Sequence, residues 1–150
     1  MRGPYRRRRV QLPPKFKNFK PSGIPRKMLE IVSLTFDEYE AIRLADYLGK
    51  QHLEASELMD ISRPTFTRLI DQARQKLAKA IVEGQELIID GGNVDFAEAL
   101  YRCRECGEEQ TSPAKDNREN CPECGSEDLE NLIHGHHGKS GRRKNKHGKN

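Results

Sequence analysis

The chain has 150 residues, of which 34% are hydrophobic, 33% are charged and 6% are aromatic. A composition this polar cannot be packed core throughout, so part of the chain must form solvated faces, linkers or tails. No run approaches the roughly 18 apolar residues of a membrane span, and no apolar signal-peptide core follows the basic N-terminus. We therefore expect no membrane partner and a cytoplasmic protein with one ordinary domain or two small ones.

The charges are segregated along the chain. Residues 1–27 hold ten Lys or Arg and residues 134–150 hold six, and neither stretch contains an acidic residue. All 23 acidic residues lie in residues 28–133, together with eleven basic ones. Two basic arms around an acidic middle are typical of proteins that meet a polyanion, above all nucleic acid, although tails that merely keep a chain soluble have the same composition.

Both ends are expected to lie outside the folded part. Pro13, Pro14, Pro21 and Pro25 exclude a continuous helix in residues 1–27, which we predict to be an extended basic N-terminal arm. Residues 134–150 consist mostly of Gly, Lys, Arg, His and Asn, and we predict a disordered basic tail there. Four of the five histidines lie in this tail: His134, His136, His137 and His147. They are compatible with a transition-metal site, but the composition favours a flexible tail.

The first helix is predicted to begin after Thr35. Thr35 as N-cap and Glu38 three residues later have the pattern of a capping box, and Leu34 with Tyr39 has that of a hydrophobic staple. Apolar residues then follow helical spacing at Ala41, Ile42, Ala45 and Leu48. Gly49 is a typical helix stop.

A short second helix is expected at about 53–59, and a long third helix follows it. Ser62 as N-cap places Pro64 in the first turn of this third helix, and Gly84 ends it. Its apolar face, which we expect to be buried, comprises Phe66, Leu69, Ile70, Ala73, Leu77, Ala80 and Ile81. Residues 86–93 then have the pattern of a short strand ending in a turn.

A short helix, a tight turn and a capped second helix make a helix-turn-helix, whose second helix enters the major groove of DNA. The apolar face points inward, so polar side chains on the far side and at the tip are predicted to contact DNA. They are Arg63, Thr65, Thr67, Arg68, Gln72 and Gln75. Arg pairs well with guanine, while Thr and Gln suit other base edges or phosphates. The alternative is a structural helical hairpin whose outer face is merely solvated.

Three separated motifs, at residues 34–44, 55–66 and 73–77, resemble region 4 of bacterial sigma factors. More closely, the chain resembles a small prokaryotic family called domain of unknown function 134, or uncharacterised protein family 0251. Its members share an arm like Arg8-Arg9-Val10 followed by residues 19–25, and a tail like residues 84–87 leading into Gly91-Gly92. The resemblance covers about residues 5–92 and implies a DNA-binding protein.

Two features depart from that family. Asp60 occupies the turn of the helix-turn-helix, where members usually have Gly. Asp tolerates the left-handed conformation, so we expect the turn to survive with some strain. Members also often carry Cys in the N-terminal arm, where this chain has Arg6 to Arg9. Any metal chemistry of that arm therefore cannot apply here.

Two Cys-x-x-Cys-Gly knuckles, separated by fourteen residues, contain all four cysteines. Facing each other, they offer the tetrahedral set of four thiolates that structural Zn²⁺ prefers, whereas disulfides do not suit a reducing cytosol. We predict that the metal ligands are Cys103, Cys106, Cys121 and Cys124. The small strands of a zinc ribbon are expected around Tyr101 before the first knuckle and around Leu129, Leu132 and Ile133 after the second.

Iron is the competing metal, because Cys-Pro-x-Cys-Gly also resembles a rubredoxin knuckle. A rubredoxin-like site lies over an aromatic core, and the segment between Gly107 and Cys121 has no aromatic residue, so zinc is favoured. A closed four-sulfur site leaves no position for a reactive water. No nucleophile elbow, P-loop or dinucleotide fingerprint occurs either, so we do not expect an enzyme.

The expected fold class is mainly α. A helix-turn-helix domain at 28–92, sigma-region-4-like or winged-helix-like, precedes a small β zinc ribbon at 99–133, and basic disordered arms flank them. The expected function is sequence-specific DNA binding in transcription regulation, with DNA as partner and Zn²⁺ as cofactor. Two alternatives stay open, a module that binds RNA polymerase or another protein and an iron-containing, rubredoxin-like redox sensor. The sequence also leaves room for a homo-oligomer.

Overall fold

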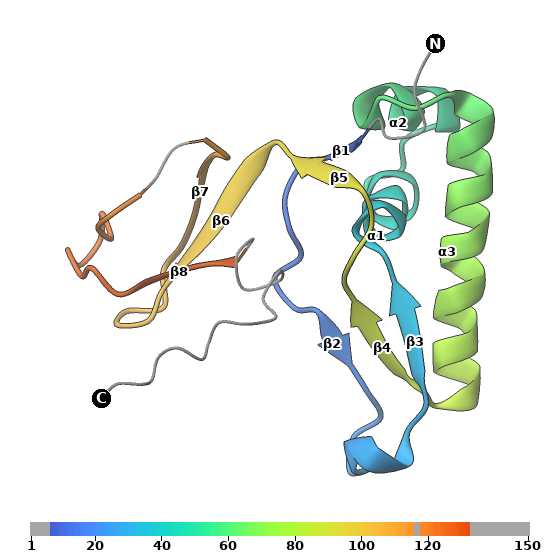
Figure 1. Ribbon diagram of the computed structural model, residues 1–150, viewed down its shortest axis with the longest axis horizontal. Coiled ribbons are helices and arrows are strands. Elements are labelled where there is room, and N and C mark those ends of the chain that lie inside the picture. The colour runs from blue at the N-terminus through green and yellow to red at the C-terminus, as the bar shows by residue number, and fades with distance from the viewer. Residues whose placement is uncertain (1–6, 116–117, 133–150) are drawn as a thin grey trace. The chain divides into compact units, whose positions relative to one another are not determined.

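The computed structural model describes residues 7–115 and 118–132 and divides into two compact units (Figure 1). The first unit comprises Met1–Val10 and Phe16–Asp95, and the second comprises Gln11–Lys15 and Phe96–Asn150. The expected tail at 134–150, with its four histidines, lies outside the described residues, as do Arg6 and Ile133.

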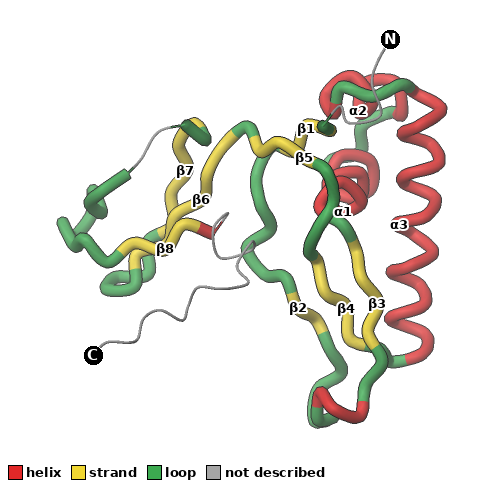
Figure 2. Tube along the Cα trace, in the orientation of Figure 1, coloured by secondary structure: helices red, strands yellow, loops and turns green. Residues whose placement is uncertain are grey.

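The expectation of a mainly α fold is wrong, because the described chain is a mixed α/β structure with three α-helices and three small sheets (Figure 2). The α-helices are α1 (Phe36–Ile42), α2 (His52–Met59) and α3 (Arg63–Glu83), and a 3₁₀ turn (Arg26–Met28) and a π-helical turn (Arg43–Tyr47) accompany them. The strands are β1 (Arg8–Val10), β2 (Asn18–Phe19), β3 (Ile31–Leu34), β4 (Glu86–Ile89), β5 (Val94–Phe96), β6 (Glu98–Cys103), β7 (Glu109–Pro113) and β8 (Leu129–Asn131).

The helices of the first unit form the connection between two parallel strands. β4 pairs in parallel with β3, with Val32 beside Leu87 and Leu34 beside Ile89. Parallel neighbours need a long crossover, and here α1, α2 and α3 supply it. The predicted strand at 86–93 is thus β4 with the turn that follows, and the helix-turn-helix segment lies inside a βαβ unit.

β3 was missed because no element was predicted before the helix that begins after Thr35. Its four residues alternate in the structure, with Val32 and Leu34 buried and Ile31 and Ser33 exposed, which is the two-residue period of a strand. A run this short gives little periodic signal, and its hydrogen-bonding partner lies more than fifty residues further along the chain.

The N-terminal arm is also not the disordered arm that we expected. β1 pairs with β5, and β2 lies antiparallel to β4, with Phe19 opposite Leu87. The prolines exclude a helix here, but they do not exclude short edge strands, which tolerate neighbouring proline. Sequence reasoning therefore removed residues 7–10 and 16–27 from a domain to which they belong.

The helix boundaries follow their local signals closely. Thr35 and Glu38 form the predicted capping box at the start of α1. α1 continues into the π-helical turn, where the Leu48 N–H donates to the Arg43 carbonyl over 2.8 Å, and the left-handed Gly49 follows. α3 starts with Ser62 as N-cap and ends at the left-handed Gly84, as predicted.

The turn between α2 and α3 is a tight reversal closed at Asp60. Asp60 has φ 62° and ψ 43°, so it adopts the predicted left-handed conformation without being glycine. Its N–H donates to the Glu57 carbonyl over 3.1 Å, and the Ile61 N–H donates to the Ser56 carbonyl over 3.0 Å. These two bonds form a Schellman motif, which satisfies the last carbonyls of α2.

The helical core of the first unit lies where α1, α2 and α3 meet. Its buried members are Ala41, Leu44, Ala55, Met59, Phe66, Leu69 and Ile70. Ile42 and Ala45 of the predicted stripe are partly buried against this cluster. Ile81 was predicted to lie on the buried face of α3, but its side chain is 78% exposed. Burial on α3 therefore ends at Ala80, one residue before the predicted apolar face does.

The second unit is built on the three-stranded antiparallel sheet β7-β6-β8. β6, the central strand, carries the buried side chains Ala99, Leu100 and Tyr101. Gln11–Lys15 belongs to this unit, because the Glu98 N–H donates to the Gln11 carbonyl over 3.0 Å and Lys15 pairs with Glu109 over 2.9 Å. β7 was not predicted, since its polar sequence has no apolar alternation.

Across residues 7–115 and 118–132, no helix is both long enough and apolar enough to cross a membrane.

Candidate metal centre and nucleic-acid interface

The two cysteine knuckles have the same backbone geometry. The Gly107 N–H donates to the Cys103 carbonyl over 2.9 Å, and the Gly125 N–H donates to the Cys121 carbonyl over 2.8 Å. Both glycines are left-handed, with φ 82° and 78°, a conformation that strains other residues. In each knuckle this turn brings the two cysteines of the pair together, as the sequence spacing predicted.

The four sulfur atoms lie within 4.8 Å of one another. Cys103 Sγ is 3.6 Å from Cys124 Sγ, and Cys106 Sγ is 3.7 Å from Cys121 Sγ. These separations are too long for disulfides, and all four cysteines are free. A metal bound at about 2.3 Å to four sulfurs in a tetrahedron separates them by about 3.8 Å. The cluster is therefore a Cys₄ site that could bind a metal ion, and its geometry suits zinc and iron alike.

The electrostatics of the cluster favour a cation. The Cys106 amide, 3.5 Å from Cys103 Sγ, lowers the pKa of the Cys103 thiol to about 7. The Glu108 amide favours the Cys106 thiolate, but burial and the neighbouring sulfurs outweigh it and raise the pKa of Cys106 to about 12. Four thiolates this close repel one another, so full deprotonation requires a positive ion among them.

The residues predicted to contact DNA divide into two groups in the structure. Arg63, Arg68, Gln72 and Gln75 are exposed on α3 and have no bonding partner within the described chain. The hydroxyl of Thr65 instead belongs to the N-cap, where Ser62 Oγ donates to it over 2.8 Å. Thr65 is therefore a capping residue as well as a tip residue.

Thr67 is held by a residue that sequence reasoning left without a role. His52, the first residue of α2, has Nδ1 2.9 Å from Thr67 Oγ1. The His52 ring also meets Phe66 edge-on, with centroids 5.2 Å apart. Fifteen residues separate His52 from Thr67, so no periodicity within one helix could have linked them. The fold alone brings them together.

The other basic residues of α3 are paired with carboxylates. Lys76 Nζ lies 2.7 Å from Oε1 of the buried Glu38, and Lys79 Nζ lies 2.8 Å from Glu83 Oε1. Arg74 forms a two-pronged pair with Asp46 in the π-helical turn. All three lie in the C-terminal half of α3, so Arg63 and Arg68, in the N-terminal half, are its two cations without a partner in the part of the chain that the structure describes.

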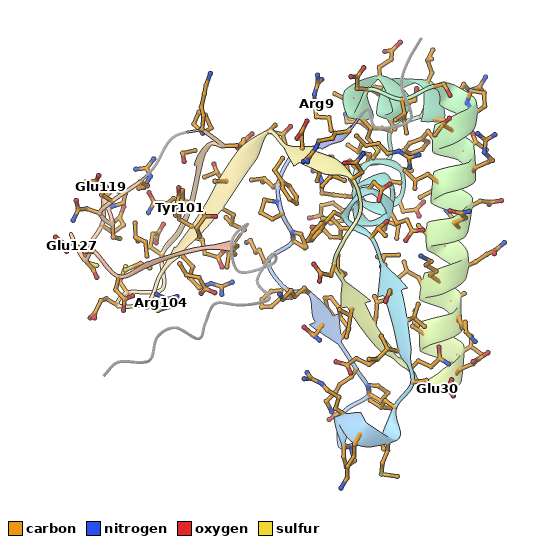
Figure 3. The ribbon with its side chains drawn as sticks, in the orientation of Figure 1. Arg9, Glu30, Tyr101, Arg104, Glu119 and Glu127 are labelled. Carbon is orange, nitrogen blue, oxygen red and sulfur yellow. The ribbon has the colours of Figure 1, made fainter. Side chains whose placement is uncertain are left out.

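The described arginines of the N-terminal segment also differ from one another. Arg7 donates to the Val94 carbonyl over 3.1 Å, and Arg8 pairs with Asp37 over 2.8 Å. Arg9 is exposed beside α2 (Figure 3) and makes no ion pair among the described residues. Arg9 is thus available to a ligand at the end of the first unit that carries α2.

Comparisons with known proteins address the family. The protein of unknown function DUF134 family matches residues 1–97. A UPF0251 protein of Chloroherpeton thalassium is 57% identical over 129 residues, which cover 86% of this chain and 85% of that protein. A UPF0251 protein of Desulforudis audaxviator is 42% identical over 81% of this chain and 80% of that protein. A UPF0251 protein of Methanocella arvoryzae is 42% identical over 82% of this chain and 76% of that protein.

The alignment with the Chloroherpeton thalassium protein is longer than the family match, so the similarity continues into the second unit. No solved structure matches the chain. The family match spans more than half of the chain and agrees with the motifs at residues 8–10, 19–25 and 84–92. The chain belongs to the DUF134 family, also called UPF0251.

Proposed function

We propose that this protein binds specific DNA sequences through the N-terminal half of α3 and regulates transcription, and that its Cys₄ cluster holds a structural Zn²⁺. The observation that carries the DNA proposal is the division of charge along α3. Arg63 and Arg68 are exposed and unpaired within the described chain, whereas the three bases of the C-terminal half each have a carboxylate partner. Unpaired arginines at the start of a helix are suited to base edges.

Neighbouring groups support the same surface. The His52 ring holds the Thr67 hydroxyl at a fixed position on the exposed face of α3. Arg9, beside α2 in Figure 3, adds an exposed cation, without an ion pair among the described residues, next to the helix that precedes the recognition helix. In helix-turn-helix proteins such cations contact phosphates and fix the register, while the second helix reads bases.

For the metal, the fit of the cluster supports a tetrahedral ion, and the lack of an aromatic residue between Gly107 and Cys121 favours zinc over iron. Sulfur separations of 3.6 Å and 3.7 Å are close to those of a tetrahedral tetrathiolate, and both knuckles already have their turn geometry. When bound, Zn²⁺ supplies a cross-link without redox chemistry. Cys103 at the end of β6 and Cys121 before β8 are the buried pair, so the ion would join the two segments that frame the sheet.

Selection from random-sequence DNA with the purified chain tests the DNA proposal. We expect an enriched sequence, and Arg68→Ala or Arg63→Ala should each weaken its binding by about 1–3 kcal/mol while reducing non-specific binding less. Lys27→Ala, which removes an exposed charge in the 3₁₀ turn, is the matched control and should bind normally. If no sequence is enriched, or if the Arg variants bind like the control, the proposal is wrong and a protein-interaction module is favoured.

Metal analysis of freshly purified protein tests the zinc proposal. We expect one Zn²⁺ per chain, lost when any of the four cysteines is changed to Ser. A red protein that contains iron and bleaches reversibly on reduction would instead establish the redox alternative.

A further inference from the structure

Within the described chain, Thr67 differs from the other predicted contact residues on the exposed face of α3, because another helix holds its side chain. His52, the first residue of α2, has Nδ1 2.9 Å from Thr67 Oγ1. Thr67 is exposed, whereas the His52 ring is half-buried and packs edge-on against Phe66, with centroids 5.2 Å apart. The Thr67 hydroxyl is therefore open to a ligand while the ring fixes its direction.

An exposed threonine hydroxyl is ordinarily ambiguous toward DNA. Its hydrogen rotates, so the same oxygen donates to a base acceptor or accepts from a base amino group. The bond to His52 removes this freedom. When that bond uses the hydroxyl hydrogen, the oxygen can only accept from a ligand, and when it uses a lone pair, the hydrogen stays free to donate.

We propose that His52 is a positioning residue that makes Thr67 an acceptor, a role that rests on the DNA binding proposed above. Thr67 then accepts from the exocyclic amino group of adenine or cytosine in the major groove. A neutral imidazole nitrogen is a much stronger base than a hydroxyl oxygen. The stronger bond is therefore the one in which the Thr67 hydroxyl donates to Nδ1, as a serine hydroxyl donates to the histidine of a catalytic triad. The ring hydrogen of His52 is then on Nε2.

The side chains beside Thr67 make an acceptor useful at this place. Arg63 lies about one helical turn before Thr67, and Arg68 follows it directly. A guanidinium only donates, so neither arginine can accept from a base amino group. Thr67 supplies the complementary contact, and its β-branched side chain loses little rotamer freedom when DNA binds.

The position of the ring hydrogen tests the acceptor role without DNA. Long-range nitrogen–hydrogen nuclear magnetic resonance spectra of the full chain at about pH 8, where an ordinary imidazole is neutral, should show the hydrogen of His52 on Nε2. Thr67→Val, which keeps the shape but has no hydroxyl, should shift the Nδ1 resonance because the bond to it is lost. A hydrogen on Nδ1 would overturn the proposal.

Base preferences within the selected DNA sequence test the effect on recognition. Each base pair is replaced in turn, and fluorescence anisotropy measures the binding of each duplex. Thr67→Val should relax the preference at one base pair by about 3- to 10-fold, the worth of one hydrogen bond. His52→Phe, which keeps a ring beside Phe66, should relax the same base pair by a similar factor. The double variant should lose no more than either single variant, and additive losses would overturn the positioning role.

Two further variants separate this role from a structural one. His52→Asn can place an amide oxygen near the position of Nδ1 and should restore the preference that His52→Phe loses. Leu53→Ala, at a side chain of α2 that is 56% exposed, is the matched control and should keep every preference. If the contact only joins the two helices, His52→Phe and Thr67→Val lower the unfolding midpoint and leave all base preferences unchanged, which would overturn the proposal.

The outcomes also distinguish this proposal from DNA binding itself. A selected sequence whose binding depends on Arg68 but whose base preferences ignore His52 and Thr67 would overturn the role of His52 alone. A chain that selects no sequence would overturn both proposals.

Discussion

Asp46 and Arg74 form a two-pronged ion pair that ties the π-helical turn to the middle of α3. Arg74 Nε lies 3.1 Å from Asp46 Oδ2, and Arg74 Nη2 lies 2.6 Å from Asp46 Oδ1. The hydrogen bonds from Arg74 lower the pKa of the Asp46 carboxyl below its usual value near 3.8. The pair therefore holds the π-helical turn, which follows α1, against the middle of α3.

This pair predicts a specific pH dependence of stability. A carboxyl with a lowered folded-state pKa contributes stability above its unfolded pKa, and this contribution disappears as the pH falls through the folded pKa. Asp46→Asn should therefore lower the free energy of unfolding at pH 7 by no more than about 1 kcal/mol, because both side chains are partly exposed. The deficit should shrink below pH 3.8. Urea titrations followed by helix circular dichroism at pH 7 and pH 3 measure it, and Asp90→Asn, an exposed carboxylate without an ion pair in the described chain, serves as control.

Gly92 makes a second prediction, at the start of α1. A Cβ added there would lie 3.0 Å from Asp37 Oδ1 and 3.2 Å from Thr35 Cβ, and φ at Gly92 is +103°. Gly92→Ala should destabilise the first unit by about 1–3 kcal/mol, because it adds both backbone strain and a clash with the capping box. Gly91→Ala carries similar backbone strain, with φ +83°, but meets no atom within 4 Å. If the two variants lose equal stability in urea titrations, the contact with Thr35 and Asp37 has no energetic weight.

The third prediction concerns metal removal. Among the described residues, the second unit has few buried side chains, namely Pro13, Pro14, Ala99, Leu100, Tyr101, Ser112, Leu132 and two of the cysteines. A core of this size cannot offset the conformational entropy that folding costs. Coordination of a metal ion by the four cysteines must therefore supply most of the stability of the second unit. A chelator, or Cys121→Ser, should collapse the amide chemical-shift dispersion of residues 98–132 while residues 36–83 stay helical. Parallel loss of both signals in nuclear magnetic resonance spectra would contradict this independence.

The fourth prediction separates two neighbouring arginines. Arg9→Ala should weaken binding to all DNA sequences about equally and reduce the salt slope by about one charge, with no change in stability, because Arg9 is exposed and unpaired within the described residues. Arg8→Ala should instead lower thermal stability, since it leaves Asp37, which is 8% exposed, without its cation. Binding measured at several salt concentrations, together with thermal melts, distinguishes the two. A salt slope that Arg9→Ala leaves unchanged would remove Arg9 from the proposed interface.

The features that were predicted correctly depend on signals between residues that are close in the sequence. Thr35, Ser62 and Gly84 set helix ends through bonds to residues within one turn, and the knuckle glycines act at equally short range. A single stretch of sequence contains all the information for such features. This explains why the caps, the turn at Asp60 and the turn of each cysteine knuckle were predictable.

Apart from β7, whose polar sequence hides its pairing with the neighbouring β6, the errors involve partners that are distant in the sequence. β1 and β2 have sequence partners about seventy or more residues away, and β3 pairs with a strand that lies beyond three helices. The spacing of apolar residues in the sequence indicates neither the contact of His52 with Thr67 nor the exposure of Ile81. Ile81 has the correct spacing for the core, but it lies beside Phe19 of the two-residue edge strand β2 and stays 78% exposed.

The place of β4 in the sheet sets the order in which this unit can assemble on the ribosome. β4 is the central strand, hydrogen-bonded to β2 on one side and to β3 on the other, yet it is the last of the three to be synthesised. β2 and β3 therefore leave the ribosome before their partner β4. They stay unpaired until more than fifty further residues have been synthesised. During that interval the helices can form their contacts with one another. The backbone groups of β2 and β3 form their hydrogen bonds only after Glu86–Ile89 has been synthesised. A fragment of the chain that ends before residue 86 would thus have formed helices beside an unformed sheet.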